Sequence, residues 1–497
     1  MARRQRWTPD SDVAAQERHD IASNGSLTMG MIVEKGQDVR TAPDSPFVVR
    51  GAIEGFYGPF YTHPQRKDLI RYLGRHGFNT YVYGPKNDRH HRSAWREPYP
   101  ATRMAQFADT VEVAKGAGVQ FVYALSPGQD IVYSSEADFA RLTDKLQRFY
   151  DVGVRAFSLF LDDIPSQFSD DVDSHHYANF ATAQADLCNR TLHWLLDRDE
   201  ACSLSMCPTD YHGAPPFSKS LQTLGAQLAP EIDVFYTGPK ICSPRITTAD
   251  VDAFAGAVRR PPLIWDNYPV NDLAMRPEMH IGPVRGRSGS LHESVRGVLA
   301  NLMLQPEASK IPMHTFAAYF QDPAGYEPEA AWEAAIREVA GTQADAVRRL
   351  GENSLGGCLR MPEAERLTAL AQEALAAMEA RAAKDDVRVQ ALESYLLQLD
   401  EACYAINYTM DNLALRQELL PWTEALQRKQ AMGRQALAVW RAQPGPTARQ
   451  MERLEELIDE VRADRTRIGG EALMAVACHV LRVTSHADSE KSPPLET

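Results

Sequence analysis

Two adjacent carboxylates, Asp162 and Asp163, are the residues of this sequence best placed for acid and base chemistry. They follow the mostly apolar run FSLFL at residues 157–161, which has the composition of a buried strand. Neighbouring strand residues point to opposite faces, so the two carboxylates are expected to do different jobs rather than share one proton. The doublet would also suit a helix cap followed by a surface aspartate, and only context separates the two interpretations.

Hydrolysis of a glycosidic bond is one reaction that needs two carboxyl groups in different roles. One group protonates the leaving oxygen, while the second attacks or stabilises the anomeric carbon. In the substrate-assisted variant the 2-acetamido oxygen of the sugar makes the attack, and the protein supplies a carboxylate that holds the amide N–H. Two adjacent acids at the end of one strand can serve both positions.

Short β-rich runs alternate with helical segments from Phe47 onward, which indicates repeated βα units around a parallel sheet. The predicted strands are residues 48–55, 80–86, 119–127, 157–163, 202–209, 233–239, 262–268 and 297–303. Helical stretches between them include residues 64–76, 102–117, 136–150 and 175–197. Eight such units over about 275 residues match an α/β fold, the (β/α)8 TIM barrel, whose usual size is roughly 250 residues. The alternative is an open, doubly wound sheet.

Nearly every predicted strand ends in charged, amide or aromatic residues. They include Glu54, Lys86, Asp162, Asp163, residues 209–211, Lys240, Asp266, Asn267 and Asn301. Barrel enzymes build their active sites from the loops at these strand ends, whereas an open sheet concentrates such residues near one crevice. The distribution favours the barrel and predicts a catalytic face at its carboxyl end.

Composition divides the chain into four predicted parts. They are a flexible N-terminal arm over residues 1–45, the catalytic barrel over 46–325, a C-terminal helical domain over 326–483 and a disordered tail over 484–497. Within the helical part, apolar residues recur at alternating spacings of three and four from Val389 to Leu413, which is a heptad seam. A helical bundle beside the barrel explains the seam, and a homodimer interface is the alternative. After the break QPGPT, a last helix is predicted over about 448–464.

The 497-residue chain carries a net charge of −13, which argues against nucleic-acid binding because phosphates require a basic surface. The sequence lacks a run of about 20 apolar residues that would span a bilayer. It also lacks an apolar signal-peptide core before Phe47. The seven cysteines follow no paired spacing, which is typical of free thiols in a reducing compartment. We therefore expect a soluble, cytoplasmic protein that binds neither nucleic acid nor membrane.

Six ordered motifs lie between Val49 and Tyr319. They are GAIEGFYGPF (51–60), NTYVYGPKNDRHHRSAWRE (79–97), FSLFLDDI (157–164), CPTDYHG (207–213), YTGPK (236–240) and IWDNYPVND (264–272). Together they resemble the O-GlcNAcase family, glycoside hydrolase family 84. The resemblance implies a (β/α)8 barrel that removes β-linked N-acetylglucosamine with retention, through an oxazoline intermediate and without a metal or other cofactor. It implies as partner a protein or glycan that bears N-acetylglucosamine.

The resemblance also implies a role for each matching residue of the catalytic group. Asp162 would orient the acetamido N–H and accept its proton as the oxazoline forms. Asp163 would be the general acid and then the general base. Tyr211, in CPTDYHG, would donate a hydrogen bond to the acetamido oxygen as it attacks. Taken alone, such a tyrosine is an ordinary amphipathic residue at a barrel edge.

Six further residues correspond to contacts with the sugar. They are Gly55, Lys86, Trp265, Asn267, Asp272 and Asn301. Trp265 would enclose the N-acetyl methyl group, although a tryptophan on a strand is more often a core residue. Asp272 would accept hydrogen bonds from two hydroxyls and so reject the wrong sugar epimer, which would leave it unsatisfied. Asn301 is followed by LMLQPEASK, which departs from the proline-containing context of that family position.

Other functions stay open at the level of sequence. His90 and His91 are adjacent on one short segment and cannot easily converge on one tetrahedral ion, so we expect no metal site there. A sugar-binding barrel without catalysis would keep Lys86, Trp265 and Asp272 but would not need both carboxylates. A hydrolase of free glycans, of the hyaluronan or chitin type, would use the same chemistry on a different substrate. The attached protein or glycan cannot be identified from the sequence.

Overall fold

The computed structural model describes residues 45–489 apart from 169, 355–356, 358, 360–362 and 443–444. The arm predicted over residues 1–45 lies outside the described residues except for Ser45. The predicted tail lies outside them from residue 490 onward.

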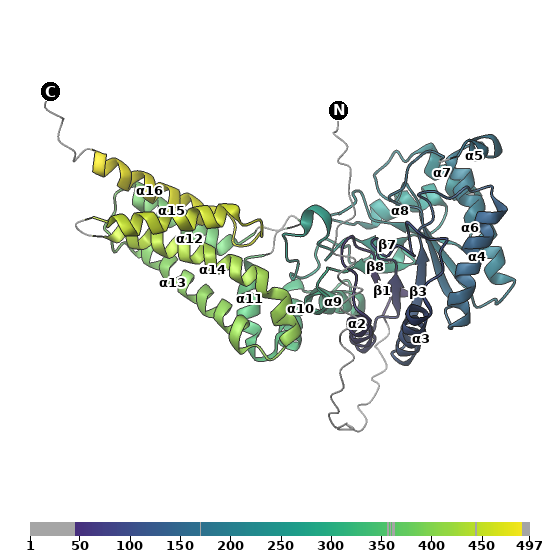
Figure 1. Ribbon diagram of the computed structural model, residues 1–497, viewed down its shortest axis with the longest axis horizontal. Coiled ribbons are helices and arrows are strands. Elements are labelled where there is room, and N and C mark those ends of the chain that lie inside the picture. Colours follow the sequence, from purple (N-terminus) through teal and green to yellow (C-terminus); the bar gives the residue numbers. More distant parts are fainter. Residues whose placement is uncertain are drawn as a thin grey trace, which may run out of the picture.

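Eight parallel strands close into a barrel in sequence order, with β1 paired to β8 (Figure 1). They are β1 (Val49–Glu54), β2 (Thr80–Tyr83), β3 (Gln120–Leu125), β4 (Ala156–Phe160), β5 (Ser203–Cys207), β6 (Asp233–Tyr236), β7 (Leu263–Asp266) and β8 (Gly297–Asn301). Seven of them lie within the predicted runs and β4 begins one residue before its run, and the closed barrel confirms the predicted α/β fold. The open, doubly wound alternative is wrong because Val49 pairs with Gly297 and leaves no free edge between β1 and β8.

Most strands end earlier than predicted. Strand β2 stops at Tyr83 rather than at residue 86, and β4 stops at Phe160 rather than at residue 163. Lys86, Asp162 and Asp163 therefore lie in loops beyond the last paired residue. Because these loops leave the sheet, the strict alternation of a strand does not dictate where their side chains point.

Helices surround the barrel and follow the strands in turn (Figure 1). They are α2 (His63–Arg75), α3 (Ala101–Gly116), α4 (Glu136–Asp151), α5 (Asp171–His176), α6 (Phe180–Leu196), α7 (Lys219–Gln227), α8 (Thr248–Val258) and α9 (Pro306–Gln321). The single helix predicted over residues 175–197 is wrong. Two helices occupy the region, because Asn179 has an extended backbone and its side chain caps the N–H of Thr182.

The inside of the barrel is filled by apolar side chains that include Ile53, Val82, Phe160, Trp265 and Leu299. Trp265 packs against Phe160 with ring centroids 4.9 Å apart. A larger core lies between the strands and the surrounding helices. The strands are therefore covered on both faces, and only their carboxyl-end loops are left to form a site.

The rest of the chain is helical and lies beside the barrel as a separate elongated body (Figure 1). It contains α10 (Pro328–Ala340), α11 (Ala344–Glu352), α12 (Glu365–Glu379), α13 (Val387–Tyr404), the π-helix η4 (Ala405–Thr409), α14 (Leu413–Arg441), α15 (Ala448–Ala463) and α16 (Ala472–Ser489). These helices, which we call the helical region, share a second hydrophobic core. None of the helices in the described residues is long and apolar enough to cross a membrane.

The predicted heptad seam is present over most of its length. Its buried members are Val389, Leu392, Leu396, Leu399, Cys403, Ile406 and Met410, which pack in the core of the helical region. The last predicted position of the seam is wrong. Leu413 is 67% exposed, because α13 passes into a π-helix and the helical path is interrupted before α14 begins. The seam is thus covered within one chain, as the bundle interpretation expects, and the homodimer stays a prediction.

Two helices follow the loop after α14. Helix α15 matches the prediction over 448–464 within one residue. Helix α16 was not predicted as a separate helix, and it runs to Ser489, beyond the expected end of the helical domain at residue 483. It packs against α14 through apolar residues such as Leu473 and Val480.

Candidate active site

The first carboxylate of the doublet, Asp162, is buried in the loop after β4, with 6% of its surface exposed. The loop is fixed by the N–H of Leu161, which donates to the carbonyl of Cys207, 2.8 Å away. The ammonium of Lys86 forms an ion pair with Oδ2 of Asp162. The other oxygen, Oδ1, is buried and has no hydrogen-bond partner among the described residues. A buried acceptor without a donor is costly, so this atom is suited to an N–H or O–H of a ligand.

The second carboxylate, Asp163, is exposed and is held by two tyrosines. The hydroxyl of Tyr57 donates to Oδ2 at 2.7 Å, and the hydroxyl of Tyr211 donates to Oδ1 at 3.0 Å. Burial raises the pKa of both tyrosines further above the usual value, so each keeps its proton as a donor at neutral pH. The doublet therefore consists of one buried and one solvent-facing carboxylate.

Arg92 fixes the position of this arrangement from the loop after β2. Its guanidinium donates to the hydroxyl of Tyr57 at 2.8 Å and to the carbonyl of Asp163 at 2.7 Å. The backbone N–H of Tyr57 donates to Oδ2 of Asp272, 2.7 Å away. Burial raises the pKa of Asp272, and the nearby Asp163 acts in the same direction. Tyr57 thus connects two carboxylates that come from the loops after β4 and β7.

A second group of side chains surrounds Trp265 on β7. Its indole N–H donates to Oδ1 of Asn267 at 3.0 Å, and the same oxygen accepts from Nδ2 of Asn301 at 2.9 Å. The oxygen of Asn301 accepts in turn from the N–H of Gly55, 3.3 Å away. Nζ of Lys86 lies 5.7 Å from the centroid of the Trp265 ring. Lys86 therefore lies close both to the Trp265 ring and to Asp162.

Gly55 is required by the close approach of the tryptophan. A Cβ added at this position would lie 2.7 Å from Cζ2 of Trp265 and 2.8 Å from a methyl group of Ile53. Any side chain here would push the indole away from the barrel interior. The backbone of Gly55 therefore sets the position of the aromatic surface.

Residues 50–352 match the model of a family described as beta-N-acetylglucosaminidase. The chain belongs to this family. Two curated relatives are called protein O-GlcNAcase: the mouse protein is 33% identical over 334 residues and the rat protein 36% identical over 276 residues. The alignments cover 63% and 54% of this chain but only 36% and 30% of the relatives. The chain thus spans about a third of the length of these relatives.

Solved structures agree with this assignment over most of the chain. A mutant of the Thermobaculum terrenum O-GlcNAc hydrolase superposes with a TM-score of 0.84 at 32% identity, covering 90% of this chain and 99% of that one. The structure called CpGH84B has a TM-score of 0.77 and covers 88% of this chain and 77% of its own. At 24% identity the second match supports the fold alone. The resemblance to O-GlcNAcases, a family of glycoside hydrolases, is confirmed.

All nine site residues predicted from sequence lie in or beside these two connected groups. The hydroxyl of Tyr211 donates to Oδ1 of Asp163. Sequence reasoning missed two residues of this candidate site, Tyr57 and Arg92. Both lie inside motifs that carry the family resemblance, GAIEGFYGPF and NTYVYGPKNDRHHRSAWRE, but nothing in their spacing relates them to Asp163.

Three further polar residues near strand ends, Asp266, His90 and His91, pack into the barrel wall rather than into the candidate site. Asp266 is buried in an ion pair with Arg287, whose Nε lies 2.7 Å from Oδ2. His91 is buried against the carbonyl of Ala124, and burial lowers its pKa to about 3. Its neighbour His90 packs against Tyr99 with ring centroids 4.9 Å apart. The two histidines hold different parts of the barrel wall and do not converge on one point.

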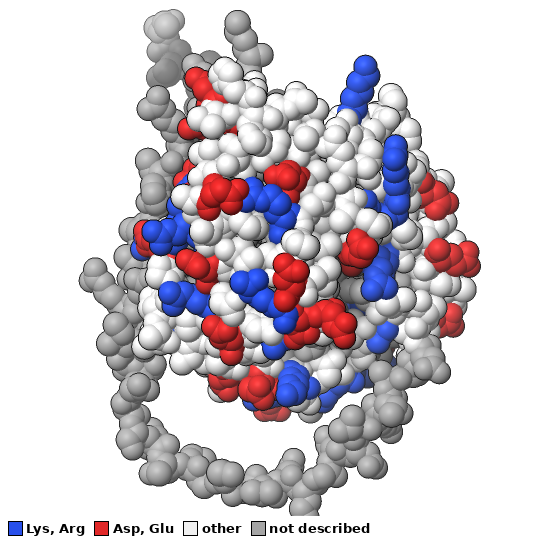
Figure 2. All heavy atoms as spheres, turned by 90° about the vertical axis from the view of Figure 1, so that its right-hand side faces the viewer, with Lys and Arg blue, Asp and Glu red and all other residues white. Residues whose placement is uncertain are grey.

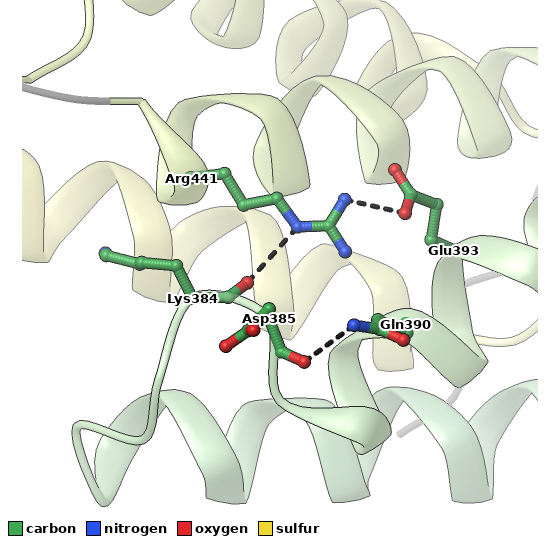
Figure 3. Close-up of a pocket in the computed structure, with 5 residues that line it drawn as sticks. All are labelled: Lys384, Asp385, Gln390, Glu393 and Arg441. Atoms are coloured by element: carbon green, nitrogen blue, oxygen red, sulfur yellow. Dashed lines mark hydrogen bonds and ion pairs between the residues drawn. The ribbon is translucent and has the colours of Figure 1, made fainter.

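A cavity of about 670 Å³ in the helical region is a different kind of site (Figure 3). It is lined by Lys384, Asp385, Gln390, Glu393 and Arg441. The guanidinium of Arg441 is paired with Glu393 at 2.6 Å, and the amide of Gln390 donates to the carbonyl of Asp385 at 2.7 Å. Arg441 and Gln390 are thus bonded to other residues of the lining, whereas Asp162 presents a buried oxygen without a partner among the described residues. The barrel, rather than this cavity, therefore holds the candidate active site.

Charges on the outer surface of the barrel are mixed in sign. On the face turned away from the helical region, Lys and Arg side chains are interspersed with Asp and Glu side chains (Figure 2). A surface that binds nucleic acid would instead gather basic residues on one side. This face has no such cluster of basic residues.

Proposed function

We propose that the protein is a retaining β-N-acetylglucosaminidase that uses the acetamido group of its substrate as the nucleophile. The observation that carries the proposal is the buried Oδ1 of Asp162, which lacks a partner among the described residues, next to the exposed Asp163. An acetamido N–H supplies the donor that Oδ1 lacks. The adjacent carboxyl is left accessible to the glycosidic oxygen.

In the first step, the acetamido oxygen attacks the anomeric carbon and the bond to the leaving oxygen breaks. Asp162 holds the amide N–H and accepts its proton as the oxazoline forms, while Asp163 gives its proton to the leaving oxygen. Lys86 balances the negative charge of Asp162 through their ion pair. Both aspartates thus act at once but on different atoms of the sugar.

In the second step, water attacks the same carbon from the side that the leaving group vacated. Asp163 takes the proton of this water, and Asp162 returns its proton to the ring nitrogen as the oxazoline opens to regenerate the acetamido group. Two displacements at one carbon retain its configuration. Asp163 therefore returns to the protonated state that the next cycle requires.

We propose that Tyr211 changes partner when the sugar binds. Its hydroxyl donates to Oδ1 of Asp163 and would donate instead to the acetamido oxygen of a bound sugar. The exchange leaves Oδ1 of Asp163 free to carry the proton that the first step consumes. Tyr57 and Arg92 act as positioning residues, because they keep their contacts with Asp163 during the exchange.

The remaining residues of the site fit recognition of one N-acetylglucosamine. The indole of Trp265 offers an apolar surface for the acetyl methyl group, worth about 0.8 kcal/mol per buried carbon. Asp272 is buried and would accept hydrogen bonds from sugar hydroxyls. Lys86, Asn267, Asn301 and the backbone of Gly55 complete the polar lining. A sugar without the acetamido group would leave Oδ1 of Asp162 unsatisfied.

For the aglycone we propose Ser and Thr side chains of proteins, since the curated relatives are called protein O-GlcNAcases. The test compares release of N-acetylglucosamine from an O-GlcNAc-modified protein with release from chitin and hyaluronan fragments. We expect the modified protein to be the better substrate. A wide preference for the oligosaccharides would favour the free-glycan alternative, and binding of the sugar without hydrolysis of a chromogenic N-acetylglucosaminide would favour the non-catalytic one.

The proposed location is the cytoplasm. Five of the cysteines that the structure describes, Cys188, Cys202, Cys207, Cys403 and Cys478, are free thiols, as expected for a reducing compartment.

A further inference from the structure

Two histidines and a glutamate from separate helices meet on the outside of the barrel, away from the active site. His76 follows α2 directly, His314 lies on α9 and Glu338 lies on α10. Nε2 of His76 is 2.8 Å from Oε1 of Glu338, and Nε2 of His314 is 3.2 Å from Oε2. One ligand atom from each of the three residues can be chosen so that all lie within 4.8 Å of one another.

This donor set is the one that divalent transition metals prefer. Two imidazole nitrogens and one carboxylate oxygen, completed by water, form a common tetrahedral zinc site with bonds of about 2.0–2.2 Å. Ligand atoms around such an ion stand roughly 3.3 Å apart. The three atoms therefore need shifts of only about an ångström to converge on an ion.

The packing around the two rings holds them in the required direction. The ring of His76 packs between Tyr72 and His314, with centroid distances of 4.3 Å and 4.9 Å. The other nitrogen of His314, Nδ1, is buried without a partner among the described residues. Nε2 is therefore the nitrogen through which His314 meets polar groups, and it faces Glu338.

The charges and exposure at this place also suit a cation. Glu338 is 41% exposed, which leaves a path for an ion from solvent, while the two histidine side chains are only 18% and 19% exposed. The ammonium of Lys310, which lies 5.4 Å from the centroid of the Tyr72 ring, is paired with Asp68 and Glu307, at 2.7 Å and 2.5 Å. The carboxylate of Glu338 is thus available to the two imidazoles and to an ion bound between them.

We propose that His76, His314 and Glu338 form a binding site for a divalent transition-metal ion, with Zn²⁺ as the best match. The ion would tie α2 and α9 of the barrel to α10, the first helix of the helical region. It has no part in the hydrolytic steps, because its ligands lie on the outer helices. Its effect is on the stability of the contact between the two bodies.

Isothermal titration of the EDTA-treated full chain with ZnCl₂ tests the site. We expect one equivalent of Zn²⁺ to bind with micromolar or tighter affinity and the melting temperature to rise by roughly 2–5 °C. His314→Ala and Glu338→Gln should each weaken binding at least tenfold and abolish the thermal shift. His193→Ala removes an exposed histidine that lies beside Asp197 on α6, and it should change neither.

Titration with Co²⁺ gives a direct measure of the ligands, because tetrahedral Co²⁺ bound by imidazole absorbs visible light. Circular dichroism verifies that Glu338→Gln, which keeps the shape of the side chain, is folded. Binding weaker than about 100 μM, or binding unchanged in both variants, would overturn the proposal. Either result would leave the three residues as a hydrogen-bonded cluster and would not bear on the hydrolase.

Discussion

Two carboxylates, the buried Asp162 of the barrel and the half-buried Glu418 of the helical region, differ in how their oxygens are hydrogen-bonded. In the barrel, Oδ1 of Asp162 has no donor among the described residues. In the helical region, Glu418 of α14 accepts from the backbone N–H groups of Glu307 and Ala308, at 3.1 Å and 2.8 Å. The second carboxylate completes a helix start, as a structural group does. The first keeps an unmet hydrogen bond that a bound ligand can supply.

The comparison predicts that changes at Asp162 remove activity and changes at Glu418 alter stability. The largest effect is expected for Asp162→Asn. An amide cannot accept the proton that leaves the acetamido nitrogen, so kcat should fall about a thousandfold on a chromogenic N-acetylglucosaminide. Steady-state kinetics measure this loss. Asp210→Asn, which changes another aspartate near the end of β5, is the matched control and should keep most of the activity.

Gly55→Ala should have the next largest effect, because its methyl group would meet the indole of Trp265 at 2.7 Å. A displacement of about 1 Å in a positioned group can cost about a hundredfold in rate, so we expect kcat/KM to fall by 10–100-fold. Gly116→Ala is the control, since a Cβ there has no neighbour within 4 Å. Equal activities of the two variants would contradict the assignment of Trp265 to the sugar site.

A smaller effect is expected for Tyr57→Phe. The change removes one of the two tyrosine donors to Asp163 and the acceptor of Arg92. We expect kcat to fall about tenfold and the pH dependence of kcat to change, with little change in KM. Tyr404→Phe alters an exposed tyrosine of the helical region and should leave the kinetics as they are. An unchanged pH profile in Tyr57→Phe would rule out its positioning of the acid.

Glu418→Gln should leave activity within about twofold and change the pH dependence of stability. Burial, aided by the charge of Glu307, raises the pKa of Glu418 to about 7, whereas its ordinary value is 4.5. The folded protein therefore holds this proton more tightly than the unfolded chain. The resulting stabilisation is present below pH 4.5 and is lost as the pH rises to about 7.

Denaturant unfolding at several pH values measures this contribution. The free energy of unfolding of the parent protein should fall relative to that of Glu418→Gln by roughly 1–3 kcal/mol across the window. Glu424→Gln, at an exposed position on the same helix, serves as the control. Parallel stability curves for the parent and Glu418→Gln would contradict a raised pKa at this position.

The sequence predicted the barrel well because its signals are local. Each strand is an apolar run bounded by turn residues, and closure follows from having eight βα units. The ends of α5, α6 and α16 were less predictable, because a single capping side chain such as Asn179 divides one helical pattern into two. The exposure of Leu413 depends on a π-helix that no heptad count reveals.

The sequence predicted the site residues that are adjacent in one motif. It missed residues that only the fold brings next to them. Asp162 and Asp163 are adjacent, but Tyr57 and Arg92 reach Asp163 only because β1, β2 and β4 end at the same face of the barrel. The different burial of the two aspartates also depends on the loop after Phe160, which leaves the sheet before either residue. His76 at the end of α2, His314 on α9 and Glu338 on α10 are brought together only by folding, and no spacing rule connects them.

The most direct test of the account compares leaving groups in Asp163→Asn and Asp162→Asn. Asp163→Asn should hydrolyse an activated aryl N-acetylglucosaminide at close to the parental rate and glycosides with poor leaving groups at least a hundredfold more slowly, because only the latter need a proton. Asp162→Asn should be impaired to the same degree on both. Rescue of Asp162→Asn by the activated substrate, or failure to rescue Asp163→Asn, would contradict the division of labour between the two carboxylates.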